Sequence, residues 1–465
     1  MNTTKNISKD ELFSKLPIPE ALFTMAVPTV ISQLINLIYN VVDAFFIGRT
    51  GNSYMMAATS VTLTMVMMNT ALSNLFGIGG GSHVARLMGQ KKTGDARSVS
   101  AFSFWGAIAT ALTYSALTGV FLDPLLRILG ASDATIGYAH SYALIVIVIG
   151  SLPAILSLAL AHLLRNSGFS GKASFGLSMG GILNCFLDPL FMFVILPKGQ
   201  EVTGAAIATA LSNAISCLYL LYAYRRAGRE MPLSFSFKEA LQVQSRDRKA
   251  VFTVGVPSAL LTGLFDLANI CVNIIASSHN DLVLAAMGIV MKVERLPNAV
   301  NVGICQGMLP IVAYNYSSGD HDRMKKAINT ARFAGLAVSA VCILFFELFA
   351  DSTAKMFLSI KAGDAATAMQ TIAYASVFLR IRCLASPVQM MNYHASYCMQ
   401  AMGKGRETLI HAFVRELIFY IPMMFLLDHL FQEIGLACAL PVGEGLASLF
   451  ALWLLHHTIQ DAQNR

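Results

Sequence analysis

Apolar runs that are long enough to cross a membrane repeat along almost the whole chain, and no other feature restricts its fold as strongly. A run of about 20 apolar residues spans the ~30 Å hydrocarbon core of a bilayer as a helix. Only 13% of the 465 residues are charged, whereas a soluble domain carries about 25%. The runs predict an all-α membrane protein with twelve transmembrane helices at approximately residues 21–47, 55–84, 97–121, 137–163, 172–196, 203–224, 251–277, 282–313, 327–349, 366–395, 408–428 and 434–457.

Basic residues are concentrated in alternate connections between these predicted helices. One set of connections is rich in lysine and arginine, whereas the other set carries only Arg49, Arg127, Lys198, Lys355 and Lys361. Because cytoplasmic connections carry the excess of basic residues, both termini are predicted to face the cytoplasm, which requires an even number of helices. The same bias accounts for the net charge of +7, so no nucleic-acid partner is expected.

The two halves of the sequence resemble each other. A Val-Pro pair opens an apolar run at Pro28 and again at Pro257, and GGGSHVARLMGQKKTGDA from Gly79 corresponds to GMLPIVAYNYSSGDHDRM from Gly307, about 228 positions later. Six helices separate the copies, which predicts two six-helix lobes of parallel topology, as in many secondary transporters. The predicted order is an N-terminal arm (1–20), a first lobe (21–224), a cytoplasmic linker (225–250), a second lobe (251–457) and a cytoplasmic tail (458–465).

The first half places a few polar side chains at membrane depth, where a charged group costs roughly 2.5–3.5 kcal/mol. Asn184 and Asp188 are four residues apart and therefore share a helical face, and Pro189 leaves a backbone carbonyl without its donor. Such oxygens suit Na⁺, and two carboxylates that cannot both ionise at low cost suit H⁺. The predicted coupling site, for Na⁺ or H⁺, consists of Tyr39, Asp43, Asn184, Asp188, Ala205 and Thr209. The alternative is that the two acids only bridge helices near the extracellular surface.

The second half contains acids and bases within its apolar runs. They include Asp266, Glu294, Arg380, Arg382 and Glu416. Buried charges of opposite sign are expected to pair, and we expect Asp266 to pair with Arg380 or Arg382. Two roles remain open, because these residues could line a wet cavity and contact a substrate, or they could hold the second lobe together.

Nothing in the sequence indicates an enzyme. The glycines around Gly79 lie in an apolar run without a preceding strand, which favours close helix packing over a phosphate loop. The eight cysteines are scattered singly, the histidines lack metal-ligand spacing, and no HExxH or nucleophile-elbow motif occurs. No cofactor is therefore expected apart from a coupling ion.

Several segments resemble the multidrug and toxic compound extrusion (MATE) family across nearly the whole chain. They are VPTVISQLINLIYNVVDAFFIG from Val27, LLRNSG from Leu163, NCFLDPLFMF from Asn184, TGAAIATALSN from Thr203 and QGMLPIVAYNYSSGDHDRM from Gln306. The resemblance implies two six-helix lobes around a central cavity, in a monomer of the bacterial inner membrane that contacts lipid. It implies cation-coupled export of small organic compounds, mostly cationic or amphipathic. It also implies a first-lobe ion site at Asp43, Asn184, Asp188 and Thr209, with Tyr39 nearby.

The sequence departs from this family in the second half. Some members carry an essential acid in helix seven, and Asp266 lies one residue away from that position when counted from Pro257. Arg380 and Arg382 are not expected in a site for cationic drugs. A flippase for a lipid-linked, anionic substrate would suit these arginines but not the two first-lobe acids. A receptor-like protein without transport and a major-facilitator transporter are further alternatives, although GQKKTGDAR does not match the signature of the latter.

Overall fold

The computed structural model describes residues 9–356 and 365–463, and in these ranges every regular element is a helix. The first half comprises α1 (Lys9–Ser14), α2 (Ile18–Arg49), α3 (Ser53–Gly89), α4 (Thr93–Val120), α5 (Leu122–Ile128), α6 (Ile136–Ala143), η1 (Leu144–Ile149), α7 (Ser151–Asn166), α8 (Ser170–Leu190), η2 (Phe191–Ile195) and α9 (Glu201–Ala227). The elements labelled η are π-helical. The first eight residues of the predicted arm, and Lys361, lie outside the described residues.

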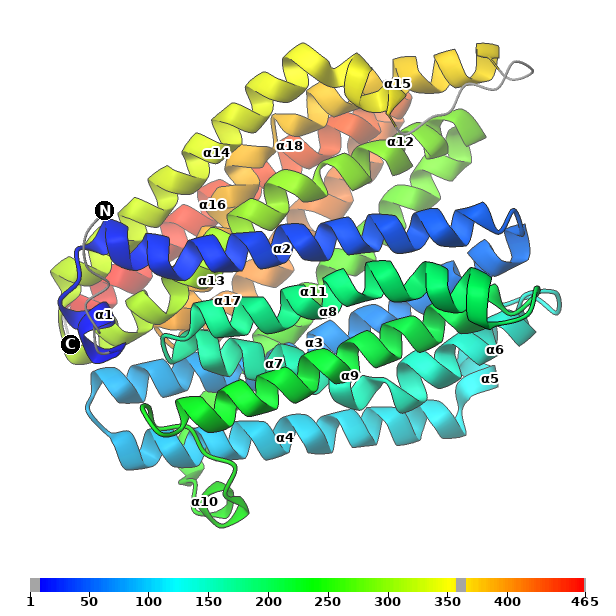
Figure 1. Ribbon diagram of the computed structural model, residues 1–465. Coiled ribbons are helices and arrows are strands. Elements are labelled where there is room, and N and C mark those ends of the chain that lie inside the picture. Colours follow the sequence, from blue (N-terminus) through cyan, green and yellow to red (C-terminus); the bar gives the residue numbers. More distant parts are fainter. Residues whose placement is uncertain (1–8, 357–364, 464–465) are drawn as a thin grey trace, which may run out of the picture.

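The connection between the lobes contains the short helix α10 (Phe237–Leu241). The second half then comprises α11 (Ser245–His279), α12 (Asp281–Val293), α13 (Arg295–Ser318), α14 (His321–Lys355), α15 (Ala365–Cys383), α16 (Ser386–Ala401), α17 (Gly405–Phe413), η3 (Val414–Tyr420) and α18 (Ile421–Gln463). Most of these helices run roughly parallel or antiparallel along one bundle axis (Figure 1).

The number of membrane passes agrees with the prediction once two features are considered. In the described residues, eight helices are long and apolar enough to cross a membrane, or ten if each of two bent pairs forms one span. The continuous stretch from Gly405 to Asp461 reverses direction at Gln432, where φ is 56°, and Gly435 lies against the backbone of Leu427. That stretch therefore supplies two passes. The predicted helix 366–395 is interrupted after Cys383, so α15 and α16 together form the remaining pass.

Left-handed backbone turns confirm the internal repeat. Lys91 (φ 61°) and Gly319 (φ 82°) end corresponding helices 228 positions apart. Gly168 (φ 88°) and Gly403 (φ 77°) do the same 235 positions apart. The offset between corresponding residues of the two halves therefore increases by seven, from 228 to 235, before the tenth pass ends.

The lobes meet near one end of the bundle, where α1 and the end of α18 also lie and which we call the terminal side (Figure 1). Glycines form the closest contacts. A Cβ on Gly255 would lie 2.0 Å from the carbonyl oxygen of Leu75, and a Cβ on Gly307 would lie 2.6 Å from the Cα of Ala26. Small residues permit such close approach of helices in membranes.

Hydrogen bonds join the lobes at the same end. His83 Nε2 lies 2.9 Å from Asp247 Oδ1, and Arg86 Nη1 donates to the carbonyl oxygens of Gln400 and Ala401 at 3.1 Å. Within residues 9–356 and 365–463, no hydrogen bond or ion pair joins the lobes near the opposite end, which we call the distal side. The structure is therefore closed on the terminal side.

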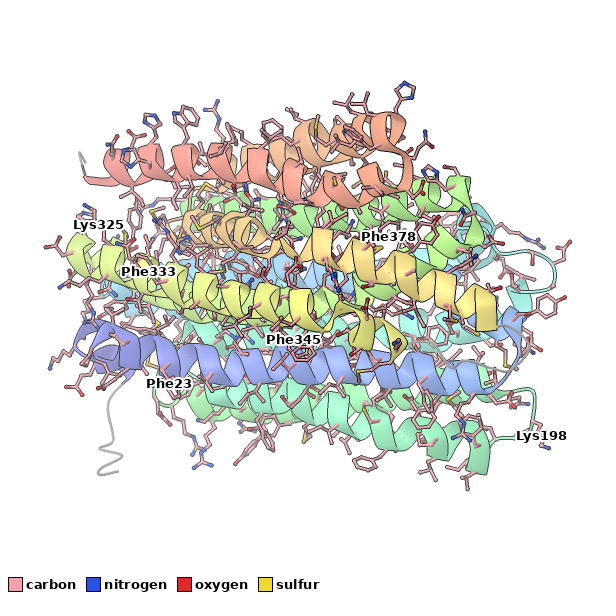
Figure 2. All side chains as sticks on the ribbon, turned by 90° about the horizontal axis from the view of Figure 1, so that it is seen from above. Phe23, Lys198, Lys325, Phe333, Phe345 and Phe378 are labelled. Carbon is pink, nitrogen blue, oxygen red and sulfur yellow. The ribbon has the colours of Figure 1, made fainter. Side chains whose placement is uncertain are left out.

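Exposed aromatic side chains cover the flanks of the bundle. Phe23 is 67% exposed and Phe333 69%, whereas Phe378 is fully buried. Figure 2 shows these residues along the length of the bundle, with Lys325 and Lys198 at opposite ends. A wide apolar surface between two charged ends fits a bilayer.

Candidate functional site

The predicted first-lobe residues come together between three helices. Asp43 lies on α2, Asn184 and Asp188 lie on α8, and Thr209 lies on α9. Helix α8 packs against both α2 and α9. The spacing of four residues between Asn184 and Asp188 directs both side chains into this junction, where they are 2% and 0% exposed.

The amide of Asn184 organises the site. Its Nδ2 donates to Asp188 Oδ1 at 3.1 Å and to Thr209 Oγ1 at 3.3 Å. Pro189 follows Asp188 directly in the sequence, and the π-helix η2 begins at Phe191. Single π-helical turns are frequent at functional sites because they reorient side chains and free backbone groups.

Three buried oxygens in this site have no hydrogen-bond partner. They belong to Asp43 (Oδ1), Asn184 (Oδ1) and Asp188 (Oδ2). In the described part of the chain, no lysine, arginine or histidine forms an ion pair with either acid. Because an ionised, unpaired carboxylate is costly at this depth, the arrangement favours uptake of a proton or a small cation.

The oxygens suit a monovalent ion better than a transition metal. Two carboxylates, an amide oxygen and a hydroxyl are hard ligands of the kind that alkali and alkaline-earth cations prefer. In the described residues, no group of three or more His, Cys, Asp or Glu side chains could hold a metal ion. The residues present therefore fit either Na⁺ or H⁺.

Two further predicted residues flank the site without donating to it. The ring of Tyr39 packs against α8 so closely that a Cβ on Gly181 would lie 3.0 Å from its Cδ1 atom, and it is near enough to interact electrostatically with Asp43 and Asp188. Ala205 is fully buried and supplies only a methyl group to the surrounding apolar cluster.

Sequence reasoning missed Tyr142 on α6. This buried tyrosine lies close enough to Thr209, Asp43 and Asp188 to interact with them electrostatically. The π-helix η1 begins two residues later. Tyr142 is one of 14 tyrosines, and no motif around it distinguishes it from the others, so only the packing of α6 against α9 identifies it.

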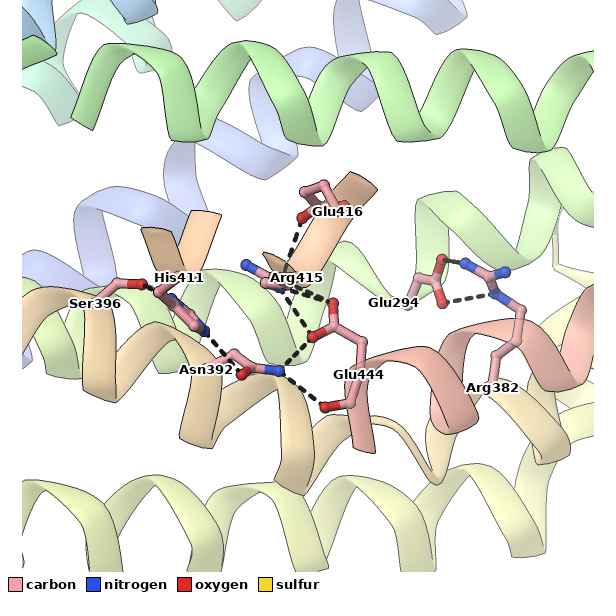
Figure 3. Close-up of polar contacts among 8 residues, drawn as sticks. All are labelled: Glu294, Arg382, Asn392, Ser396, His411, Arg415, Glu416 and Glu444. Atoms are coloured by element: carbon pink, nitrogen blue, oxygen red, sulfur yellow. Dashed lines mark hydrogen bonds and ion pairs between the residues drawn. The ribbon is translucent and has the colours of Figure 1, made fainter. Parts of the chain in front are cut away.

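The second lobe buries its charges as ion pairs (Figure 3). Arg415 donates to Glu444 through Nη2 at 2.6 Å and through Nε at 3.0 Å, and Asn392 Nδ2 donates to the same carboxylate at 2.6 Å. Arg382 holds Glu294 with two nitrogens, at 2.6 and 3.0 Å. Arg382, Arg415 and Glu444 are nearly inaccessible to solvent.

The expected pairing of Asp266 with Arg380 or Arg382 is wrong. Helix α15 packs against α12 and α14, which brings Arg382 to Glu294 and Arg380 to within 3.8 Å of Asp351. Asp266 lies half-buried on α11 and interacts electrostatically with Arg295 instead. Glu416 lies next to Arg415, at 3.5 Å from its Nε.

Comparison with known proteins identifies the family. The sequence profile of the MatE family matches residues 28–190 and 257–426. The chain is 28% identical to the multidrug export protein MepA of Staphylococcus saprophyticus and 28% identical to that of Staphylococcus haemolyticus, and each match covers 96% of both chains.

Solved structures agree with the fold at lower identity. A crystal structure of MATE in complex with MaL6 superimposes with a TM-score of 0.92 at 20% identity, over the full length of both chains. An outward-facing multidrug resistance MATE family transporter of the MOP superfamily gives a TM-score of 0.90 at 20% identity, again with full coverage. With the two matched halves, the two-lobed bundle of twelve passes and the buried polar site in the first lobe, the chain belongs to the MATE family of multi-pass membrane transporters.

Proposed function

We propose that this protein exports cationic or amphipathic organic compounds across the bacterial inner membrane in exchange for inward Na⁺ or H⁺. The observation that carries the proposal is the pair Asp43 and Asp188, each of which has one buried oxygen without a hydrogen-bond donor and neither of which has a counter-charge among the described residues. The relatives that match almost the full chain are named multidrug export proteins, which supports drug-like substrates.

The excess of basic residues in alternate connections supports an orientation in which the terminal side faces the cytoplasm. If the terminal side is the cytoplasmic side, the closed contacts between the lobes face the cytoplasm and the conformation is outward-facing. The coupling site would then lie nearer the external solution. At 1.5 Å per residue, Asp188 is about 27 Å along the axis from the start of α8 on the terminal side.

Ion binding would act on the packing of α2 against α8. Occupancy by a proton or Na⁺ removes the repulsion between Asp43 and Asp188, and release restores it. Each net inward charge in a transport cycle supplies about 2.3 kcal/mol per 100 mV of membrane potential. That energy supports a substrate gradient of roughly 50-fold.

The second lobe favours a cationic over an anionic substrate. Glu294 neutralises Arg382, and Glu444 neutralises Arg415. These buried arginines therefore offer little free positive charge to a lipid-linked anionic substrate, which weakens the flippase alternative. We further propose that the protein acts as a monomer within membrane lipid.

Reconstitution in liposomes tests the proposal. Efflux of a fluorescent organic cation would be followed under a Na⁺ gradient and, separately, under a pH gradient. We expect one gradient to drive flux, and Asp43→Asn or Asp188→Asn to abolish it. Asp123→Asn is the matched control, because Asp123 is exposed and pairs with His140. Flux that survives both site substitutions would place coupling elsewhere.

A further inference from the structure

Glu416 is a buried acid that the proposed coupling site does not use. In the described residues, three acids have buried carboxylate oxygens without a hydrogen-bond partner, namely Asp43, Asp188 and Glu416. Both oxygens of Glu416 lack one, and the residue is 1% exposed. An acid in this state needs a proton or a matching positive charge.

The nearest positive charge is already matched by another acid. Arg415 makes three hydrogen bonds to Glu444, at 2.6 to 3.2 Å, whereas its Nε lies 3.5 Å from Glu416 Oε1 without making a hydrogen bond. Glu444 also accepts from Asn392. Two carboxylates therefore share one guanidinium, and all three side chains are about 1% exposed. If both acids were ionised, the cluster would carry one uncompensated negative charge.

The other titratable groups around Glu416 do not supply a second cation. His411 is satisfied as a neutral ring, because its Nε2 faces Asn392 Oδ1 at 3.1 Å and its Nδ1 faces the Ser396 hydroxyl at 2.9 Å (Figure 3). Protonated histidine would also be repelled by Arg415. The remaining groups are tyrosines or belong to other pairs: Tyr393 under the guanidinium, Tyr420 beside Arg382, the Arg382–Glu294 pair, and Asp266 near Arg295.

The local backbone brings the two neighbouring side chains inward together. Arg415 and Glu416 are adjacent in sequence, and both are buried within the π-helix η3. In the 235-residue register set by Gly168 and Gly403, Glu444 corresponds to Thr209 of the coupling site, and Glu416 corresponds to Gly181, which packs against Tyr39. The cluster thus lies on the second-lobe equivalents of α8 and α9.

We propose that Glu416 is a second proton-binding site and carries a proton in the conformation described above. A metal cation is disfavoured there because the guanidinium of Arg415 is only 3.5 Å away and would repel it. If Arg415 turned from Glu444 towards Glu416, Glu416 could ionise only as Glu444 took up the proton, because the single guanidinium balances one carboxylate. A role of Glu416 in transport rests on the antiport proposed above, whereas the protonation of Glu416 does not depend on it.

Infrared absorption of the full-length protein in lipid bilayers tests the proposal. The carbonyl band of protonated carboxylic acids should contain a component in the wild type that is lost in Glu416→Gln. Glu230→Gln is the control, because Glu230 is exposed on the terminal side and its loss should leave that band unchanged. Asp43→Asn and Asp188→Asn proteins should retain the Glu416 component. Failure of the coupling-site proposal can therefore be distinguished from failure of the Glu416 proposal.

A second variant tests how the acids share Arg415. In Glu444→Gln the guanidinium should turn to Glu416, which would then ionise, and its protonated band should disappear although Glu416 is still present. Glutamine closely mimics a protonated glutamate, so Glu416→Gln should keep the unfolding temperature of the wild type. The proposal is overturned if Glu416→Gln removes a carboxylate band instead, leaves the carboxylic-acid band intact, or prevents folding.

Discussion

In the first lobe Asp43 and Asp188 each have a buried carboxylate oxygen without a partner, whereas in the second lobe Glu294 and Glu444 are each held by an arginine at 2.6 Å. Both sites lie within helix bundles related by the same repeat. The difference is therefore one of side-chain chemistry on a shared backbone plan. In one lobe an acid has to acquire its partner from solution, and in the other the partner is covalently part of the chain.

This contrast separates transport from stability. An acid without a protein partner contributes little to folding, but its charge changes whenever an ion arrives or leaves. A buried pair cannot change state cheaply, and removing one partner leaves the other uncompensated. The effects of substitutions in the two lobes should therefore differ in two measurements, the free energy of unfolding and the coupled flux.

The largest effect is expected when a second-lobe pair is broken. Arg415→Met leaves Glu444 without its cation, and we expect the free energy of unfolding to fall by about 3–5 kcal/mol. Asp188→Asn should leave it unchanged or raise it, because it removes an unpaired acid. Chemical unfolding in detergent or bilayers measures both. Equal destabilisation by the two variants would break the comparison.

Removing both partners of the pair should cost less than removing one. In the double variant Arg415→Met with Glu444→Gln no charge of the pair is left, while the glutamine that replaces Glu444 could still accept a hydrogen bond from Asn392. We expect the double variant to regain roughly 2 kcal/mol relative to Arg415→Met. A double-mutant cycle provides the measurement, and strictly additive losses would contradict the pairing.

A smaller effect is expected at the first-lobe tyrosine that the sequence did not reveal. Tyr142→Phe removes a hydroxyl near Thr209, which is worth about 1 kcal/mol and hence about fivefold in the affinity for the coupling ion. Flux at a saturating gradient should be retained. Tyr138→Phe, on the same helix, serves as the control. An unchanged ion dependence would show that Tyr142 only packs.

The smallest effect is expected at Asp266. It is half-buried, and its electrostatic partner Arg295 is exposed, so the interaction resembles a surface pair worth less than about 1 kcal/mol. Asp266→Asn should leave both unfolding and coupled flux nearly unchanged. Loss of flux in this variant, measured beside Asp188→Asn, would show that the second lobe also holds an essential acid.

The sequence predicted those features that depend on a membrane or on spacing along one helix. Apolar run lengths gave the passes, and the four-residue spacing of Asn184 and Asp188 gave one face of the coupling site. Contacts between helices could not be obtained in this way. The partner of Arg382 depends on α15 packing against α12, and Tyr142 contributes only because α6 packs against α9. Neither fact leaves a periodic pattern in the chain.

The glycine contacts on the terminal side have a kinetic consequence. Gly255 and Gly307 bring one lobe directly against the backbone of the other. Separation of the lobes there breaks the polar contacts of His83 and Arg86 and the ring contact between Phe76 and Phe252, so both kinds of contact would contribute to the activation barrier. A valine or leucine at either glycine would be expected to alter the rate of conformational exchange before it altered ion selectivity.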